Sequence, residues 1–273
     1  FSNTVPIVVQ ALEQTLDHTT LKYVSTAVEN FGGKSSEMDI SFRDLLSHVT
    51  TVVTRQSNLS ELTELLQAYF ECLQRYLCFC TRSLCYNEHF NTITALSVES
   101  TQALQAKEST RACLNYLSQF MKLATLSSSQ LYPEASQVLQ EAWNPVILSL
   151  LSSQGPKLVQ NCVTGLSGGS QMLWPAYSDC LFSLIQSIVL NQSLQQQASK
   201  NVPTGVLVGE RTVEQWLVSS LSAEFVSASS AGETSNQING RIQLETCQQV
   251  TSILLRLAST GPKSRPKAKL LLS

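Results

Sequence analysis

The sequence contains three histidines, eight cysteines and two glycine-rich stretches, which are residue types that often support catalysis or bind metals and phosphates. His18, His48 and His89 are scattered, and none lies four residues from another histidine or beside a paired carboxylate. Histidines that bind a metal or transfer protons usually have such partners close by. We therefore expect all three at the surface or at helix ends. We interpret Asp17-His18 as a turn between two stacked helices rather than as an acid–base pair.

Cysteines are the other candidates for a metal site. Cys78, Cys80 and Cys85 lie close together in the sequence, but positions two apart on a helix point in different directions. No Cys-x-x-Cys pair and no histidine pair completes a ligand set. Most of the cysteines have apolar helical neighbours, as expected for free thiols in a reduced intracellular compartment. The eight are Cys72, Cys78, Cys80, Cys85, Cys113, Cys162, Cys180 and Cys247.

Motifs for phosphate binding and for nucleophilic catalysis are absent. The glycines of 165–169 and 205–209 do not form the phosphate-loop pattern and follow no predicted strand, so we interpret them as helix ends. The sequence also lacks a Gly-x-Ser-x-Gly motif, a His-Glu-x-x-His motif and a clustered carboxylate pair. We therefore predict that the protein is not an enzyme and has no catalytic, cofactor-binding or metal-binding residues.

Composition and charge narrow the classes of function that the sequence allows. The chain has 273 residues and a net charge of -2, which argues against direct nucleic-acid binding. No apolar run reaches the roughly 18 residues that span a bilayer, so we expect no membrane partner. The chain begins at Phe1, without a methionine or a basic signal region. We therefore expect a piece of a longer protein.

The pattern of residues 15–33 predicts a short amphipathic helix, which is the basic element of the expected fold. Apolar residues recur there at steps of three and four, which places them on one face of a helix. Thr19 or Thr20 is expected to cap the helix, and Gly32-Gly33 to end it. Such a helix cannot bury its apolar face alone. The residues of that face are Leu21, Val24, Ala27, Val28 and Phe31.

The same pattern recurs along the chain and predicts about ten to twelve helices with almost no strand. The helix from Asn58 or Ser60 to Leu84 is apolar over much of its circumference, so we expect it between neighbours on both sides. Residues 191–209 and 227–239 are expected loops, and 202–208 is the one candidate strand. The other expected helices are 3–16, Asp39 or Ser41 to 56, 90–104, 110–126, Pro133 onward, 144–155, 156–165, 174–190, 210–225 and 242–258.

Paired-helix units repeat at roughly 40 to 50 residues, which is the period of HEAT repeats. We therefore predict an all-α fold, an α-α superhelix of HEAT/ARM-like antiparallel helix pairs, with a compact helical bundle as the alternative. One domain is expected over 1–260 and a basic flexible tail over 261–273. Trp143, Trp174 and Trp216 are expected in the core.

Four segments resemble the C-terminal part of the importin-β (karyopherin-β) superfamily, closest to its transportin-SR/importin-13 branch. Thr15-Leu16-Asp17-His18 resembles a repeat opening in that branch, and 177–189, YSDCLFSLIQSIV, resembles a late helix. Trp216-Leu217 followed by Ser220-Leu221 resembles its Trp-Leu/Ile-x-x-Ala/Ser-Leu helix. Residues 241–257, which end in Leu-Leu-Arg-Leu, resemble the closing helix. Their order and spacing agree with the family over nearly the whole chain.

The resemblance implies a nuclear transport receptor that binds cargo proteins and supports their Ran-dependent import. It implies Ran-GTP binding mainly through repeats N-terminal to this chain, contacts with nucleoporins, and shuttling between cytoplasm and nucleus. Cargo in this branch includes Arg/Ser-rich splicing factors. No cargo-binding residue carries over. The alternatives are a HEAT-repeat scaffold or adaptor for a stable complex, and an exportin of the same superfamily.

Overall fold

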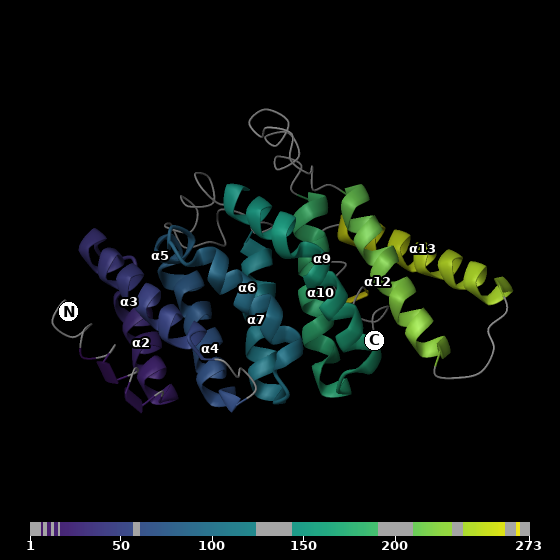
Figure 1. The fold of residues 1–273 in the computed structure, drawn as a ribbon. Coiled ribbons are helices and arrows are strands. Elements are labelled where there is room, and N and C mark those ends of the chain that lie inside the picture. Colours follow the sequence, from purple (N-terminus) through teal and green to yellow (C-terminus); the bar gives the residue numbers. More distant parts are fainter. Residues whose placement is uncertain are drawn as a thin grey trace. The chain divides into compact units, whose positions relative to one another are not determined.

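The computed structural model describes residues 7, 10–11, 14–15, 17–56, 61–123, 144–190, 210–230, 237–259 and 266–267. All regular elements in these ranges are helices, which confirms the all-α prediction (Figure 1). The chain forms two compact units, Phe1–Leu150 and Leu151–Ser273. The candidate strand at 202–208 lies outside the described residues, as do Pro133 and Trp143.

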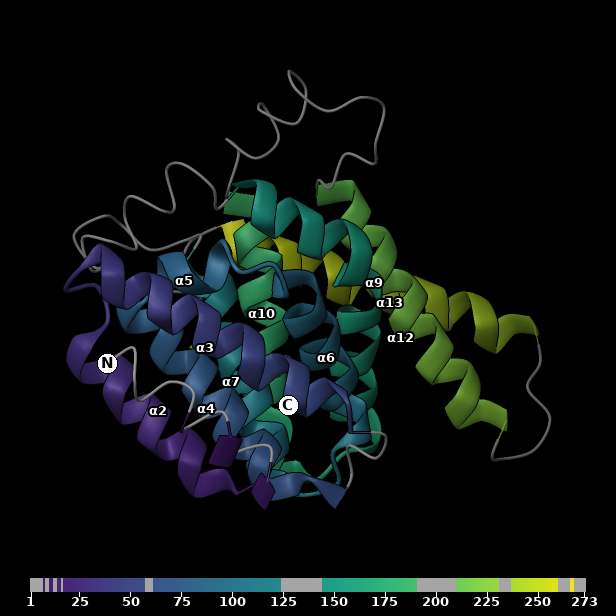
Figure 2. The same cartoon turned by 60° about the vertical axis from the view of Figure 1, so that its left-hand side comes forward.

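In the first unit, one row of helices lies side by side and a second set packs beside it (Figure 2). The row is α2 (His18–Phe31), α4 (Thr63–Phe79) and α7 (Lys107–Leu123), in which α2 packs on α4 and α4 packs on α7. The second set is α3 (Ser36–Thr54), α5 (Thr81–Cys85) and α6 (Phe90–Ala103), in which α3 contacts both of the others.

Helix α4 lies at the centre of the row and is buried on several faces, which confirms the prediction that it has neighbours on both sides. Its aromatic residues Tyr69, Phe70 and Tyr76 are fully buried. The Phe70 ring stacks on Tyr116 of α7, with ring centroids 6.4 Å apart. The Tyr69 hydroxyl lies 3.0 Å from the Thr50 hydroxyl of α3, so a polar pair is satisfied inside the core.

The helix starts differ from the predicted caps. Asp17, rather than Thr19 or Thr20, is the N-cap of α2, and its carboxylate accepts from the Thr19 amide at 3.0 Å. Helix α3 begins at Ser36 after the N-cap Ser35, so the predicted start at Asp39 or Ser41 was wrong. Ser35 accepts from the Met38 amide at 3.2 Å, which satisfies an otherwise unpaired donor of the first turn.

The turn between α2 and α3 uses its two glycines for different reasons. Gly33 has φ 69°, a left-handed conformation that favours glycine. Gly32 is not left-handed, but a Cβ there would lie 2.6 Å from the Val28 carbonyl oxygen and 2.7 Å from the Phe79 carbonyl oxygen. Gly32 therefore allows the end of α2 to approach the end of α4.

The predicted helix up to Leu84 was wrong at both ends, because α4 begins at Thr63 and ends at Phe79. Cys80 interrupts it with φ -147° and ψ 43°, and α5 follows. The interruption lets the Ser83 hydroxyl donate to the Asp39 carbonyl oxygen at 2.8 Å. The interruption at Cys80 therefore allows a hydrogen bond that connects α5 to α3.

The second unit contains α10 (Trp174–Leu190), α12 (Glu210–Ser230) and α13 (Gln237–Ser259), each of which packs against the other two. The short 3₁₀ helix η4 (Gln171–Leu173) leads into α10. The predicted loop 227–239 was too long, because α12 continues to Ser230 and α13 begins at Gln237.

Helix α9 (Asn144–Gly168) was predicted to break at Gly155-Pro156, and this was wrong because the helix continues through Pro156. The Trp216 ring of α12 packs against Gly155, where a Cβ would lie 2.6 Å from the ring. The Tyr177 ring of α10 packs in the same way against Gly165. These two contacts hold α9 on either side of the proline.

Glu224 of α12 adds a polar connection to α9. Its carboxylate accepts from the Ser167 hydroxyl at 2.7 Å, from the Thr164 hydroxyl at 2.5 Å and from the Gln160 amide at 3.3 Å. Hydrogen bonds to a charged acceptor are stronger than neutral ones. Helix α9 is therefore attached to α12 both by the packing of Trp216 on Gly155 and by hydrogen bonds to the Glu224 carboxylate.

The predicted division into one domain over 1–260 and a tail over 261–273 stays a prediction. Of the tail, only residues 266–267 are described, and both are exposed.

Candidate functional site

The three histidines are separated in space by the elements that carry them. His18 is the first residue of α2, and its Nδ1 lies 3.4 Å from carboxylate oxygens of both Asp17 and Glu64. His48 is exposed on α3. His89 is the N-cap of α6 and lies 3.6 Å from Glu88. These positions confirm the predicted surface and helix-end placement.

Cys78, Cys80 and Cys85, which are close in the sequence, have different surroundings in the structure. Cys80 Sγ lies 3.3 Å from Asp39 Oδ1 and 3.2 Å from Ser83 Oγ, whereas Cys85 is buried and Cys78 is only partly buried. Burial raises the pKa of Cys80 and of Cys85 to about 12, so both thiols are protonated near neutral pH. All eight cysteines are free, and seven are buried, which confirms that they pack as small hydrophobic residues. Within the described ranges no group of three or more metal-ligating side chains comes together.

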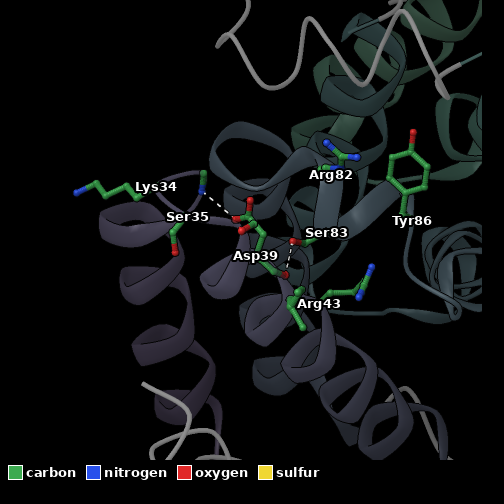
Figure 3. Close-up of a pocket in the computed structure, with 10 residues that line it drawn as sticks. Lys34, Ser35, Asp39, Arg43, Arg82, Ser83 and Tyr86 are labelled. Carbon is green, nitrogen blue, oxygen red and sulfur yellow. Dashed lines mark hydrogen bonds between the residues drawn. The ribbon is translucent and has the colours of Figure 1, made fainter.

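A pocket of about 550 Å³ lies where the turn between α2 and α3 meets α5. Figure 3 shows Arg43, Arg82 and Tyr86 on one side of Asp39, with Lys34 on the other side. Pockets of this volume are large enough to hold several side chains of a ligand. We take this pocket, called here the α3–α5 pocket, as the candidate site. Its lining residues are Gly33, Lys34, Ser35, Ser36, Asp39, Ile40, Arg43, Arg82, Ser83 and Tyr86.

Asp39 fixes the geometry of the pocket wall. Its carboxylate accepts from the Gly33 amide at 3.1 Å and from Cys80 Sγ, and its carbonyl oxygen accepts from the Ser83 hydroxyl. Three separate segments therefore meet at one residue. Because the Asp39 side chain already accepts two hydrogen bonds, it is a structural part of the wall.

The charges that line the α3–α5 pocket are mostly positive, since its described lining holds Lys34, Arg43 and Arg82 and one carboxylate, that of Asp39. Neither Arg43 nor Arg82 forms an ion pair with any carboxylate of the described part of the chain. The Arg82 guanidinium lies 5.6 Å from the Tyr86 ring centroid, and Lys34 Nζ lies 5.6 Å from the Phe31 ring centroid. These cation–π contacts orient the cations without neutralising them.

Apolar side chains are also exposed at the pocket. Ile40 is 51% exposed and Tyr86 is 42% exposed, and both line it. Phe31, 43% exposed, lies beside Lys34 at the same turn. Large apolar side chains that gather at one exposed place, next to cations, are typical of a surface that contacts another molecule.

Two other pockets lie on the row of α2, α4 and α7, with volumes of about 380 and 260 Å³. Both contain charges of either sign. In the larger, Arg75 pairs with Glu29 at 3.6 Å. The two cations of the larger pocket, Lys22 and Arg75, are balanced by Glu29 and Glu71, and the described lining of the smaller pocket has one cation, Arg111, against Glu71 and Glu108. Both pockets therefore attract an anionic ligand less than the α3–α5 pocket does.

Sequence reasoning did not identify this site. Arg82 and Tyr86 are four residues apart, a spacing that places them on one helical face and was visible in the sequence. Arg43 and Ile40 lie on another helix, about 40 residues earlier, and only the fold brings them to the same pocket. The sequence predicts that Gly32-Gly33 ends a helix, but it does not indicate that this turn lines a pocket.

None of the described helices combines the length and the hydrophobicity needed to cross a membrane. No protein-family model matches the chain, and no curated protein matches it.

Proposed function

We propose that the chain is a cargo-binding part of a nuclear transport receptor of the importin-β superfamily and has no enzymatic activity. In this proposal its helices form an α-α superhelix of HEAT-type pairs. The proposed work is to hold cargo proteins by many distributed contacts and to release them when Ran-GTP binds. Repeat arrays suit this work, because small rotations at each repeat add up to a large change in shape.

The row of α2, α4 and α7 is the observation that carries the proposal. Each helix packs on the next member of the row, and of the helices between them in the sequence, α3 contacts both α5 and α6. Apart from the short α5, which is followed by α6 in the same set, consecutive helices alternate between the two sets, and such alternation is the arrangement expected of stacked helix pairs. A row of this kind provides an extended surface rather than a single deep site.

The placement of the resembling segments also supports the proposal. Residues 177–189 lie within α10, the segment from Trp216 to Leu221 lies within α12, and 241–257 lies within α13. Residues 15–18 end at the first residue of α2. Each segment thus falls on a helix or at a helix start, as the resemblance requires.

The partners follow from the same proposal. They are cargo proteins, including Arg/Ser-rich splicing factors, together with nucleoporins and Ran-GTP. Ran-GTP contacts are placed mainly in repeats that would precede this chain in a longer protein. The protein is proposed to shuttle between the cytoplasm and the nucleus.

The test compares Ran loaded with a non-hydrolysable GTP analogue and Ran loaded with GDP. The longer protein that contains this chain is immobilised with bound cargo from nuclear extract, and each form of Ran is added. We expect the GTP form alone to bind and to release the cargo. The same protein without residues 1–273 should still bind Ran-GTP but retain little cargo.

Other outcomes point to the alternative functions. Tighter cargo binding in the presence of Ran-GTP would indicate an exportin. Cargo binding that is unaffected by either nucleotide form, with no binding of Ran, would contradict the transport proposal and favour a fixed scaffold.

A further inference from the structure

We propose that the α3–α5 pocket binds an acidic peptide segment of a partner protein. In this arrangement the carboxylates of the segment pair with Arg43 and Arg82, and an apolar side chain of the segment packs against Ile40 and Tyr86. The inference goes beyond nuclear transport, since it needs only that this helical array binds proteins.

Charge is the first argument. Arg43 is partly buried and Arg82 is exposed, and they belong to different helices on the same side of Asp39 (Figure 3). Neither has a carboxylate partner among the described residues. Guanidinium groups bind carboxylates through two parallel hydrogen bonds, which gives geometric selectivity as well as attraction. Two such groups at one pocket favour a ligand with more than one carboxylate.

Asp39 offsets only part of this positive charge, because Lys34, Arg43 and Arg82 also line the pocket. Its Oδ1 accepts from the Gly33 amide and from Cys80 Sγ, and its carbonyl oxygen accepts from the Ser83 hydroxyl, so the carboxylate is held in the wall. The first-turn amide of Met38 in α3 is likewise occupied by the Ser35 side chain. The cationic side chains that line the pocket are those of Arg43, Arg82 and Lys34.

The apolar residues argue for a peptide rather than a small inorganic anion. Ile40 and Tyr86 expose about half of their surface at the pocket, and Arg82 lies over the Tyr86 ring. A simple anion would leave these side chains in water. A peptide with an apolar residue between acidic ones would cover them while pairing with the arginines, as in protein interfaces built on Tyr and Arg.

The two arginines and the overall charge of -2 favour a peptide over a nucleic acid. Nucleic-acid sites usually present many cations along an extended track. The described lining of the pocket instead combines two arginines and one lysine with exposed apolar groups.

The experiment measures binding of a short fluorescein-labelled peptide, in which glutamates flank a single phenylalanine, to the complete 273-residue chain by fluorescence anisotropy. We expect saturable binding that weakens as salt is raised. Arg43→Ala with Arg82→Ala should weaken binding by at least about tenfold. Ile40→Ser should weaken it at every salt concentration, because it removes an apolar contact.

Arg55→Ala is the matched control, because Arg55 is an exposed arginine of the same sequence region that does not line the pocket. This variant should bind the peptide as the unchanged chain does. Peptides with lysine in place of glutamate, or serine in place of phenylalanine, should bind weakly. Circular dichroism and urea unfolding of each variant confirm that its fold is retained.

The proposal is overturned if the folded chain does not bind the acidic peptide, or if the Arg43/Arg82 double variant binds it equally well. It is also overturned if a labelled single-stranded RNA binds the pocket better than the peptide and loses binding in the double variant. These results would leave Ran-dependent cargo release untouched, whereas loss of Ran dependence with intact peptide binding would contradict only the transport function.

Discussion

The hydroxyl of Tyr76 in α4 donates a 2.9 Å hydrogen bond to the carbonyl oxygen of Phe42 in α3. The two rings also meet edge to face, with centroids 6.3 Å apart and planes at 88°. Both residues are fully buried, and burial raises the pKa of Tyr76 well above its usual value, so the hydroxyl remains a donor. This pair joins the row of α2, α4 and α7 to the set that contains the α3–α5 pocket.

Replacement of Tyr76 by phenylalanine should therefore destabilise the first unit while keeping its aromatic packing. We expect the free energy of unfolding to fall by about 1 kcal/mol, because the Phe42 carbonyl loses a buried partner. Urea unfolding followed by circular dichroism measures the loss. Tyr23→Phe is the control, because Tyr23 is 57% exposed, and it should unfold at the same urea concentration as the unchanged chain. Equal stability of Tyr76→Phe and Tyr23→Phe would contradict this prediction.

Gly32→Ala should destabilise the chain by roughly 1–3 kcal/mol, the range for added atoms in a packed region. The new Cβ would meet two backbone oxygens, those of Val28 and Phe79, which have little freedom to move. Thermal unfolding provides the measurement. Gly168→Ala is the control, since no atom lies within 4 Å of a Cβ at that position. A Gly32→Ala chain as stable as Gly168→Ala would show that α2 can shift without cost.

Asp17 should make the stability of α2 depend on pH. Hydrogen bonds from the Thr19 side chain and amide lower the pKa of the Asp17 carboxyl below 3.8 in the folded chain. The unfolded chain therefore takes up a proton at higher pH, so the contribution of Asp17 is complete above about pH 3.8 and is lost as pH falls through the folded pKa.

The measurement for Asp17 compares unfolding midpoints with those of Asp17→Asn, which keeps a capping side chain but does not titrate. We expect the difference between the two chains to shrink below pH 3.8. A difference that stays constant through the acid range would contradict the assignment. Carboxyl titration by NMR in Thr19→Ala should show the Asp17 pKa moving up, because the side-chain donor is gone.

Glu224→Ala should weaken the attachment of α9 to α12. The change removes the carboxylate acceptor of the Thr164 and Ser167 hydroxyls, although Ser167 keeps the Thr164 carbonyl oxygen as an acceptor. We expect a loss of about 1 kcal/mol, at the low end for a charged acceptor because the site is partly exposed. Urea unfolding monitored by Trp216 fluorescence, in a chain that also carries Trp143→Phe and Trp174→Phe, gives the value. Glu214→Ala, an exposed position of α12, should have no effect beyond helix propensity.

Thiol chemistry should distinguish Cys78 from the other cysteines. Cys78 is partly exposed, whereas Cys72, Cys80 and Cys85 are buried and have pKa values raised to about 12. At pH 8 a thiol with that pKa is ionised in only about one molecule in ten thousand. We expect one thiol per native chain to react with Ellman's reagent, and Cys78→Ser to remove that reaction. Rapid modification of several native thiols would contradict the burial described above.

The sequence alone predicted those helices whose own pattern of apolar residues shows which faces are buried. Helix α4 is one example, because leucines and aromatic residues around its circumference required neighbours on both sides. The break at Cys80 was not predictable in this way, because the residue that Cys80 contacts there, Asp39, lies 41 positions away. Helix α9 likewise continues through Pro156 next to a contact that the local sequence does not reveal, that of Gly155 with Trp216 of another helix.

The α3–α5 pocket was missed for the same physical reason. Arg82 and Tyr86 share a helical face by their spacing, but a pair of exposed residues does not define a pocket. The pocket exists because the left-handed Gly33 turns the chain, and because Ser83 connects α5 to α3. Distances of this kind are set by tertiary packing, which local sequence patterns do not encode.

The buried cysteines of each unit can serve as probes of local unfolding in that unit. Cys72, Cys80, Cys85 and Cys113 lie in the first unit, and Cys162, Cys180 and Cys247 lie in the second. A buried thiol is modified only when the helices around it open, so the rate at each position reports a local opening free energy. Mass spectrometry of the unmodified sequence could therefore rank the two units by the ease with which each one opens.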